Sequence, residues 1–248
     1  MRARLGLRRV IDHRTAEEAR AAPTNLARRA TSEAIATALL LAAIVGSGIM
    51  GQRLAAGNVA IALLANAIAT GAGLIALIVA FGPISGAHLN PVVSAAEAAR
   101  GNISTHDAAT YAAAQILGAF VGVALAHGMF EEPLFSISQH ARSGFAQFLS
   151  EIVATFGLLA VIQGGKRTPA SVPFAVGGYI TAAYWFTGST SFANPAVTLA
   201  RAASDTFAGI RPTDVAMFLA AQAIGATGAT ALFHWLDVSS TGVNFRAR

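Results

Sequence analysis

The chain lacks cysteine and carries little charge. None of its 248 residues is a cysteine, which excludes disulfide bridges and metal sites with thiolate ligands. Charged residues make up 12% of the sequence, whereas an ordinary globular domain has about 25%. Hydrophobic residues make up 54%, and the mean hydropathy is +0.57. This composition predicts an integral membrane protein.

The chain also lacks an apolar run in its first 30 residues, which are rich in arginine, so these residues are not a secretory signal. Beyond them, long stretches carry almost no charge. A membrane-spanning helix needs about 20 mostly apolar residues. Six candidate spans lie near residues 33–52, 58–81, 106–128, 145–164, 171–187 and 214–236.

Basic residues concentrate in the tails. Eight of the 17 Lys and Arg residues fall in residues 1–30, and only Arg53, Arg142, Arg201 and Arg211 fall in the loops of the opposite side. This asymmetry predicts that both termini are cytoplasmic. They form a basic tail at residues 1–30 and a C-terminal tail at residues 239–248. We expect a bacterial plasma (inner) membrane as the location. Nucleic acid is not expected as a partner, because it requires a clustered basic face on a folded surface.

The two halves of the chain resemble each other. Three landmarks recur in the same order, at offsets of 104 to 118 residues: Glu33 and Glu151, Asn90 and Asn194, and the segments 111–119 and 218–226. Residues 31–130 and 145–238 therefore form two repeats, joined by an outer loop at 131–144. Each repeat holds three spans, an odd number, so the repeats enter the membrane from opposite faces as an inverted repeat.

Each repeat contains an Asn-Pro dipeptide in apolar surroundings, Asn90-Pro91 and Asn194-Pro195. Asn is a strong N-cap and Pro suits the first position of a helix. Ten helical residues from Pro91 onward cover about 15 Å, half of a bilayer. Two half-helices would then meet at the midplane, with their positive ends and both Asn amides facing one cavity. Such a cavity favours neutral hydrogen-bonding solutes and opposes cations.

The segment Ser85–Pro91 and the later Asn194–Ala196 resemble the two signature loops of the aquaporins and glycerol facilitators, the major intrinsic protein family. The resemblance covers roughly residues 31–238. It implies an all-α membrane protein with six transmembrane helices and two re-entrant half-helices around a pore, assembled as a homotetramer. The implied pore midpoint is Asn90, Pro91, Val92, Asn194, Pro195 and Ala196.

The resemblance also assigns roles to polar residues within the spans. Glu33 and Glu151 match recurrent helix residues of the family, as do Gln115 and Gln222. The family pattern implies that the two glutamates hold the diving loops through backbone donors. A proton relay is the alternative, since ionisable groups inside a membrane are functional hypotheses by default. His88, within the first diving loop, is expected to line the pore and could also be a pH gate.

The sequence departs from the family at the expected constrictions. Val92 replaces the usual Ala after Asn90-Pro91. By the family pattern the outer selectivity filter consists of Thr70, Ala182, Ser191 and Val197. Water-selective members have an aromatic residue, a His and an Arg at such positions, and none of these is present. We therefore expect a wide, uncharged ring that passes glycerol, urea or protonated metalloid acids together with water. A water-selective aquaporin is the alternative.

Arg201 follows Val197 by four residues, so it lies on the same helix face, one turn of about 5.4 Å further out. We hypothesise that it lines the outer vestibule and partly replaces the missing charge. The alternatives are that it snorkels to the surface or pairs with Asp205. Tyr184, with Trp185 and Trp235, falls near a span end, where an interfacial aromatic belt is expected.

An ion-coupled secondary transporter is the rival from another class, because such transporters also use inverted repeats and broken helices. It would need coupling groups at the midplane, and the two glutamates are the only charged candidates. No catalytic set, phosphate loop, cofactor fingerprint or metal-spaced cluster is present in the sequence. We therefore expect neither an enzyme nor a cofactor or metal site; the expected partners are the lipid bilayer, water and small neutral solutes.

Overall fold

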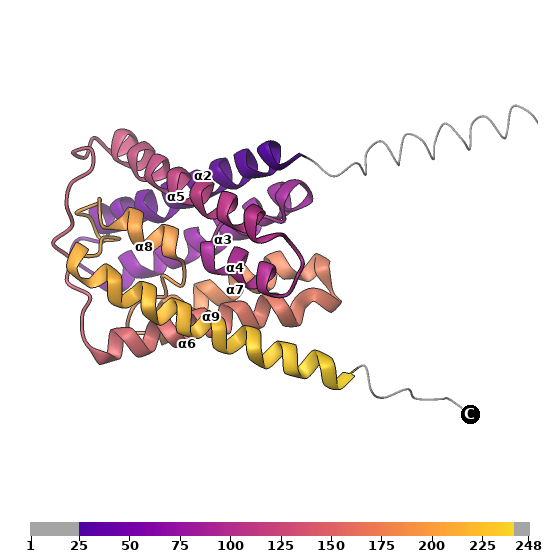
Figure 1. Cartoon of the computed structure of the whole chain (residues 1–248). Helices are drawn as coiled ribbons and strands as arrows, with labels where there is room; N and C mark the ends of the chain where they lie inside the picture. The colour runs from indigo at the N-terminus through magenta and orange to yellow at the C-terminus, as the bar shows by residue number, and fades with distance from the viewer. Residues whose placement is uncertain (1–24, 241–248) are drawn as a thin grey trace, which may run out of the picture.

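The computed structural model describes residues 25–240, which are helical apart from short connections (Figure 1). Among these residues there is no strand. The helices are α2 (Leu26–Leu54), α3 (Val59–Ser85), α4 (Pro91–Ala99), α5 (Thr105–Phe130), α6 (Phe145–Gly164), α7 (Val172–Phe186), α8 (Pro195–Arg201) and α9 (Pro212–Ser240), with 3-10 turns at Gly165–Arg167 and Pro169–Ser171.

Each of the six predicted spans corresponds to one helix, but the tail boundaries differ from the prediction. Helix α2 begins at Leu26, inside the predicted tail 1–30, because Asn25 accepts a hydrogen bond from the backbone N–H of Arg28 as its N-cap. Helix α9 continues to Ser240, into the predicted C-terminal tail. The remainder of both tails, 1–24 and 241–248, lies outside the described residues.

Five of the described helices are long and apolar enough to cross a membrane. The sixth, α7, has 15 residues, which is about 22 Å of helix. The two 3-10 turns that precede it lengthen this crossing.

The helices repeat one arrangement in both halves. Helix α5 packs along α2 in the first half and α9 along α6 in the second, while α3 packs against α7 between the halves. Helix α2 begins and α9 ends at one end of the bundle, which we call the terminal end (Figure 1). The connection 131–144 lies at the opposite end, which we call the loop end. This is the predicted inverted repeat.

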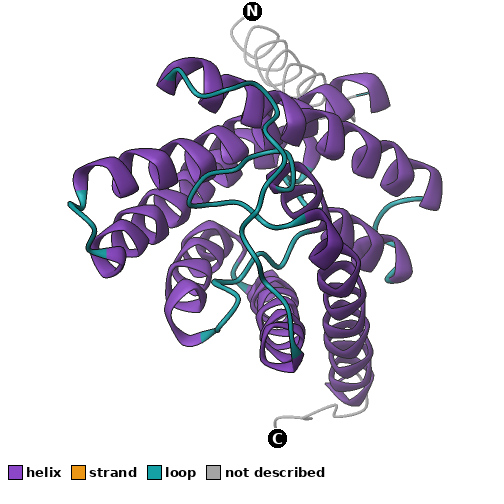
Figure 2. Ribbon diagram, turned by 90° about the vertical axis from the view of Figure 1, so that its left-hand side faces the viewer, coloured by secondary structure: helices purple, strands orange, loops and turns teal. Residues whose placement is uncertain are grey.

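The half-helices α4 and α8 run in opposite directions. Arg100, just after α4, pairs with Asp237 near the end of α9, so α4 runs to the terminal end. Ala202, just after α8, accepts a hydrogen bond from the backbone of Ser138, so α8 runs to the loop end. Seen from the loop end, the connecting loops cross the middle of a ring of helices (Figure 2).

Glycines allow the paired helices to approach closely. A Cβ atom added at Gly118 of α5 would lie 2.2 Å from the carbonyl oxygen of Ala34 on α2, and one at Gly122 would lie 2.2 Å from that of Ala38. In the second half, a Cβ atom at Gly225 would lie 2.4 Å from the carbonyl oxygen of Ile152. Small residues of this kind let helices pack in lipid, where no hydrophobic force drives them together.

Replacing Gly118 with Ala should destabilise the bundle by about 1–3 kcal/mol, because the added methyl group overpacks the α2–α5 contact. Gly128→Ala, on the same helix, is the matched control, since nothing lies within 4 Å of an added Cβ there. Thermal unfolding of the detergent-solubilised protein compares the two variants. Equal midpoints for Gly118→Ala and Gly128→Ala would contradict the close approach.

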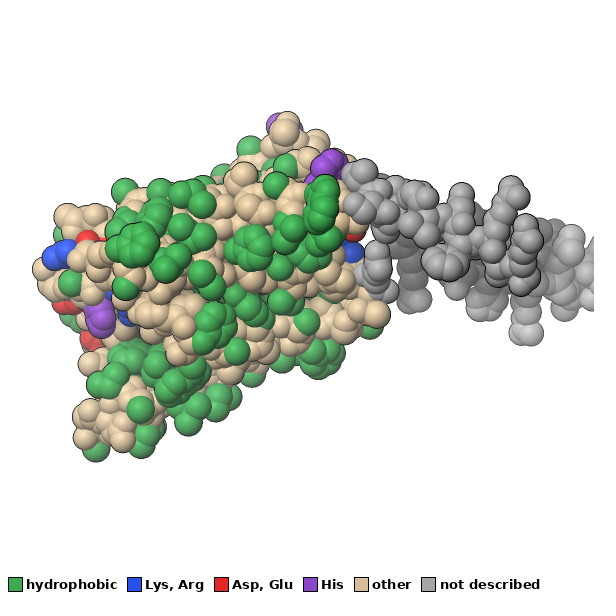
Figure 3. Space-filling view, turned by 90° about the horizontal axis from the view of Figure 1, so that it is seen from below, with side chains coloured by type: hydrophobic (Ala, Val, Ile, Leu, Met, Phe, Trp, Pro, Cys, Tyr) green, Lys and Arg blue, Asp and Glu red, His purple; other side chains and the backbone are tan. Residues whose placement is uncertain are grey.

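The surface is apolar along the sides of the bundle, and the visible charged side chains gather at its ends (Figure 3). Large apolar residues such as Leu54, Leu117, Met129 and Phe174 are exposed, whereas Glu33, Gln115, Glu151 and Gln222 are fully buried. A soluble protein has the opposite distribution for its largest side chains. The chain is therefore an integral membrane protein.

Candidate functional site

A cavity of about 340 Å³ runs through the bundle. Helix α7 contributes Val172, Val176, Ile180 and Tyr184 to its wall, and α3 contributes Thr70, Leu74 and Ile78. A spacing of four residues places these side chains on one helix face, so the cavity follows the helix axes. The α7 series alone covers about 18 Å at a rise of 1.5 Å per residue.

The two half-helices begin head to head at the middle of this cavity. The Nδ2 atom of Asn90 donates to the carbonyl oxygen of Ala193 at 2.7 Å, and that of Asn194 donates to the carbonyl oxygen of Leu89 at 2.7 Å. Each Asn therefore ties its own half to the other. An amide nitrogen carries two N–H groups, so one donor of each Asn is left for the cavity, which both residues line.

The Oδ1 atoms of the same residues cap the half-helices. Asn90 accepts from the backbone N–H of Val92 at 3.1 Å, and Asn194 accepts from that of Ala196 at 2.9 Å. Neither Val92 nor Ala196 lines the cavity. The larger side chain of Val92 therefore does not narrow the midpoint, and the neighbouring Val93 faces the cavity instead.

The diving segments before each Asn have matching backbone strain. Ala87 and Leu89 have φ angles of 46° and 52°, and Ser191 and Ala193 have 52° and 48°. In both segments, the residues three positions and one position before the Asn adopt the left-handed backbone conformation. Such strain costs about 1–3 kcal/mol per residue and persists only where the surroundings fix it.

Two buried glutamates provide that constraint. Glu33 accepts hydrogen bonds from the backbone N–H groups of His88 and Leu89 at 2.9 and 2.7 Å. Glu151 accepts from those of Phe192 and Ala193, both at 2.9 Å. Each carboxylate therefore holds the diving segment of its own repeat, in the contacts that the family resemblance implied.

A glutamine adds a further donor to each carboxylate. Gln115 donates to Glu33 at 2.8 Å and Gln222 donates to Glu151 at 2.7 Å. The same glutamine nitrogens reach hydroxyl groups on the half-helices, Ser94 at 3.1 Å and Thr198 at 2.9 Å. The inverted repeat thus extends to individual hydrogen bonds.

Three of the four residues expected at the outer filter line the cavity, namely Thr70, Ser191 and Val197. The fourth does not: Ala182 is exposed, so its expected position in the pore is wrong. The position of Ala182 comes from the family pattern on the assumption of no gap in the alignment. A small error in that alignment selects the wrong helix face, because each residue turns a helix by about 100°.

Tyr184 takes the place on α7 that was expected for Ala182. It is buried, it lines the cavity, and its hydroxyl lies 3.2 Å from the Oγ1 atom of Thr70. Its expected role in an interfacial belt is therefore wrong, and the cavity wall does contain an aromatic residue. The series of apolar residues four apart along α7 was the signal in the sequence.

Arg201 lines the cavity, as hypothesised, and is buried with 1% of its surface exposed. Its Nε atom donates to the carbonyl oxygen of Ala208, and its Cζ atom lies 3.4 Å from the centre of the Phe192 ring. It does not snorkel to the surface. In the described part of the chain it forms no ion pair with Asp205, which accepts from the backbone N–H of Gln139 instead.

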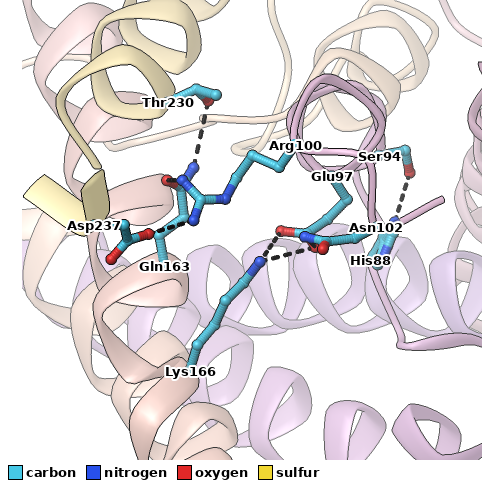
Figure 4. A network of polar contacts seen from close by, with 9 residues as sticks. All are labelled: His88, Ser94, Glu97, Arg100, Asn102, Gln163, Lys166, Thr230 and Asp237. Atoms are coloured by element: carbon cyan, nitrogen blue, oxygen red, sulfur yellow. Dashed lines mark hydrogen bonds and ion pairs between the residues drawn. The ribbon is translucent and has the colours of Figure 1, made fainter. Parts of the chain in front are cut away.

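At the terminal end the cavity wall contains an ion pair that the sequence did not reveal (Figure 4). The Nζ atom of Lys166 lies 2.9 Å from Oε1 of Glu97, and Asn102 donates to Oε2 of Glu97 at 2.7 Å. His88 lies nearby in the wall, with its Nδ1 atom 3.0 Å from the Oγ atom of Ser94. The sequence signal for Glu97 as a cavity-lining residue was its spacing from Asn90 and Val93, which places all three on one face of α4.

The model of the major intrinsic protein family matches residues 20–171, more than half of the chain. The chain belongs to the major intrinsic protein family. It is 54% identical to a protein of Rhizobium meliloti named aquaglyceroporin AqpS, over 86% of this chain and 91% of the other. It is 30% identical to a protein of Bradyrhizobium diazoefficiens named aquaporin Z, over 87% and 96% of the two chains.

Among solved structures, this major intrinsic protein is similar to the aquaglyceroporin from Plasmodium falciparum, with a TM-score of 0.69. The match covers 86% of this chain and 96% of the other at 21% sequence identity, which establishes the shared fold. The aquaporin-like architecture predicted from the Asn-Pro pair is thus confirmed. Within the described residues, no cluster of three or more His, Asp or Glu side chains is arranged to hold a metal ion.

Proposed function

We propose that this protein is a passive transmembrane channel for small uncharged polar solutes, such as glycerol, urea and protonated metalloid acids, and for water. The observation that carries the proposal is that one cavity is lined by both Asn90 and Asn194. Its wall includes Lys166 and Glu97 from the terminal end and Arg201 from the loop end. A solute could therefore follow one path along the bundle.

The chemistry of the wall suits neutral solutes that form hydrogen bonds. The free N–H groups of Asn90 and Asn194 supply donors at the midpoint, and the rest of the wall is mostly apolar. Within the described part of the chain, no backbone donor reaches the carbonyl oxygens of Ala87, His88 and Phe192, and these residues line the cavity, so we propose these carbonyl groups as acceptors. The positive ends of the half-helices and the buried Arg201 oppose cations.

Thr70, Tyr184, Ser191 and Val197 are proposed as the outer filter. The filter keeps a valine at the position where water-selective members have an arginine, which supports passage of solutes larger than water. The name of the Rhizobium meliloti relative supports the same substrate class. The name of the Bradyrhizobium diazoefficiens relative keeps a water-selective aquaporin as the alternative.

An ion-coupled transporter has less support, because Glu33 and Glu151 are occupied by three or more donors each. Carboxylates held in this way are not free to bind and release a coupling ion. The distribution of Lys and Arg supports a cytoplasmic terminal end, and the bacterial relatives support a plasma membrane location. The family resemblance supports a homotetramer with one pore in each subunit.

The proposal is tested by stopped-flow light scattering of proteoliposomes in inward gradients of sucrose, glycerol and urea. We expect glycerol and urea to enter at least about tenfold faster than in protein-free vesicles, a difference of about 1.4 kcal/mol in the barrier. Vesicles that pass water but exclude glycerol would identify a water-selective aquaporin. Uptake that requires a proton or sodium gradient would identify a coupled transporter.

A further inference from the structure

Apart from Oε1 of Glu97, which is paired with Lys166, two polar atoms of cavity-lining residues lack a hydrogen-bond partner in the described part of the chain. They are the Nη1 atom of Arg201 and the Oγ atom of Ser191. Both residues are more than nine-tenths buried, with exposed fractions of 1% and 3%, and both line the cavity. Buried polar groups in folded proteins are almost always paired, and an unpaired charged donor is especially costly.

A neighbouring buried arginine uses its donors on carbonyl groups of the protein. Arg142 donates from Nε to the carbonyl oxygen of Gly209 at 2.8 Å, and from Nη1 to that of Ser189 at 3.1 Å. It is not part of the cavity wall, and it fastens the second diving segment to the loop end. Arg142 thus has a structural role, whereas Arg201 retains a donor that no group among residues 25–240 uses.

The two residues are both neighbours of Phe192, Ser191 along the chain and Arg201 in space. Ser191 precedes Phe192 in the chain, and the guanidinium of Arg201 lies over the Phe192 ring. The Cζ atom of Arg142 lies 4.9 Å from the centre of the same ring. The contact with Phe192 and the hydrogen bond to Ala208 hold the Arg201 guanidinium in place, so its remaining donor is preorganised.

Two arginines lie close to the same ring in this locality. Arg142 and Arg201 both lower the pKa of His140, in addition to the larger effect of burial. Glu151, the carboxylate that interacts with both arginines, is already bound by backbone groups and by Gln222. In the described part of the chain no acceptor is left for the free N–H of Arg201, which is therefore available to a molecule in the cavity.

We propose that Arg201 and Ser191 form a binding subsite for the acceptor oxygen of a permeating neutral solute, one helical turn beyond Val197. Arg201 donates from Nη1 to a carbonyl or hydroxyl oxygen of the solute, and the Ser191 hydroxyl donates to or accepts from the same group. Recognition of the oxygen thereby extends beyond the outer filter, from Ser191 to Arg201. The inference rests on the proposed function and names a residue that sets its specificity.

The test measures urea flux into proteoliposomes at increasing urea concentration. A binding subsite makes the flux saturate, and Arg201→Met should raise the half-saturating concentration about tenfold, as expected for a hydrogen bond to a charged donor. Arg53→Met is the matched control, because Arg53 is exposed and pairs with Glu132 away from the cavity.

Unsaturated urea flux in the native protein, or an unchanged half-saturating concentration in Arg201→Met, would overturn the subsite. If Arg201→Met does not fold, Ser191→Ala decides: a severalfold increase in the half-saturating concentration supports the subsite, and no change overturns it. Failure of the native protein to pass urea or glycerol at all would refute the proposed function itself. The two ideas therefore fail in different measurements.

Discussion

Replacing Val197 with Arg should reduce glycerol and urea permeability at least about tenfold, which corresponds to about 1.4 kcal/mol. Val197 is buried in the cavity wall at the loop-end side of Asn194. The longer side chain would fill the cavity at that level. It would also place a second positive charge one turn from Arg201, on the same helix face, where like charges repel. Water permeability should fall less, because water needs less width.

Val197→Met is the matched control, since methionine is also longer than valine but carries no charge. If glycerol flux falls less in Val197→Met than in Val197→Arg, the additional loss in Val197→Arg is due to the charge and hydration of the arginine. Stopped-flow measurements on all three proteins, at equal amounts of reconstituted channel, give the comparison. Unchanged glycerol permeability in Val197→Arg would show that this position does not face the permeation path.

Replacing Glu151 with Leu should destabilise the protein by roughly 2–6 kcal/mol, because the backbone N–H groups of Phe192 and Ala193 lose their acceptor. These donors lie in a segment whose left-handed residues, Ser191 and Ala193, are already strained. A loss of this size is comparable to the whole stability of many domains. We therefore expect a large fall in the unfolding midpoint and loss of solute flux.

Glu132→Leu is the matched control for this prediction. Glu132 forms an exposed ion pair with Arg53 at 2.9 Å, and such pairs contribute about 0–1 kcal/mol. The fluorescence of Trp185 and Trp235 reports thermal unfolding in detergent. Equal midpoints for Glu151→Leu and Glu132→Leu would mean that the diving segment is held by other contacts.

The sequence was sufficient for the architecture, because the features that determine it are local. Apolar runs of membrane-spanning length define the long helices, and Asn-Pro defines the start of each half-helix through capping and a fixed φ angle. The odd number of spans per repeat then determines the inversion. The start of α2 was misplaced because its cap, Asn25, lies in a polar stretch without an apolar pattern.

The cavity wall was predicted only in part, because helix rotation depends on packing between helices. Thr70, Ser191 and Val197 face the cavity as expected, but Tyr184 faces it where Ala182 was expected. A shift of two residues turns a helix face by about 200°, and composition alone does not reveal it. The ion pair between Glu97 and Lys166 joins residues 69 positions apart and was not recognisable from the sequence.

The sequence by itself determined a membrane protein of two inverted repeats with half-helices meeting at Asn90 and Asn194. These features follow from hydropathy, capping and span number, which act along the chain. Only the tertiary structure decided which side chains form the pore and which donors remain free. Whether the N–H groups of Arg201 find partners depends on Ala208 and Phe192, which approach it from two different loops. That pairing is a property of the packed bundle, because burial removes water as the alternative partner.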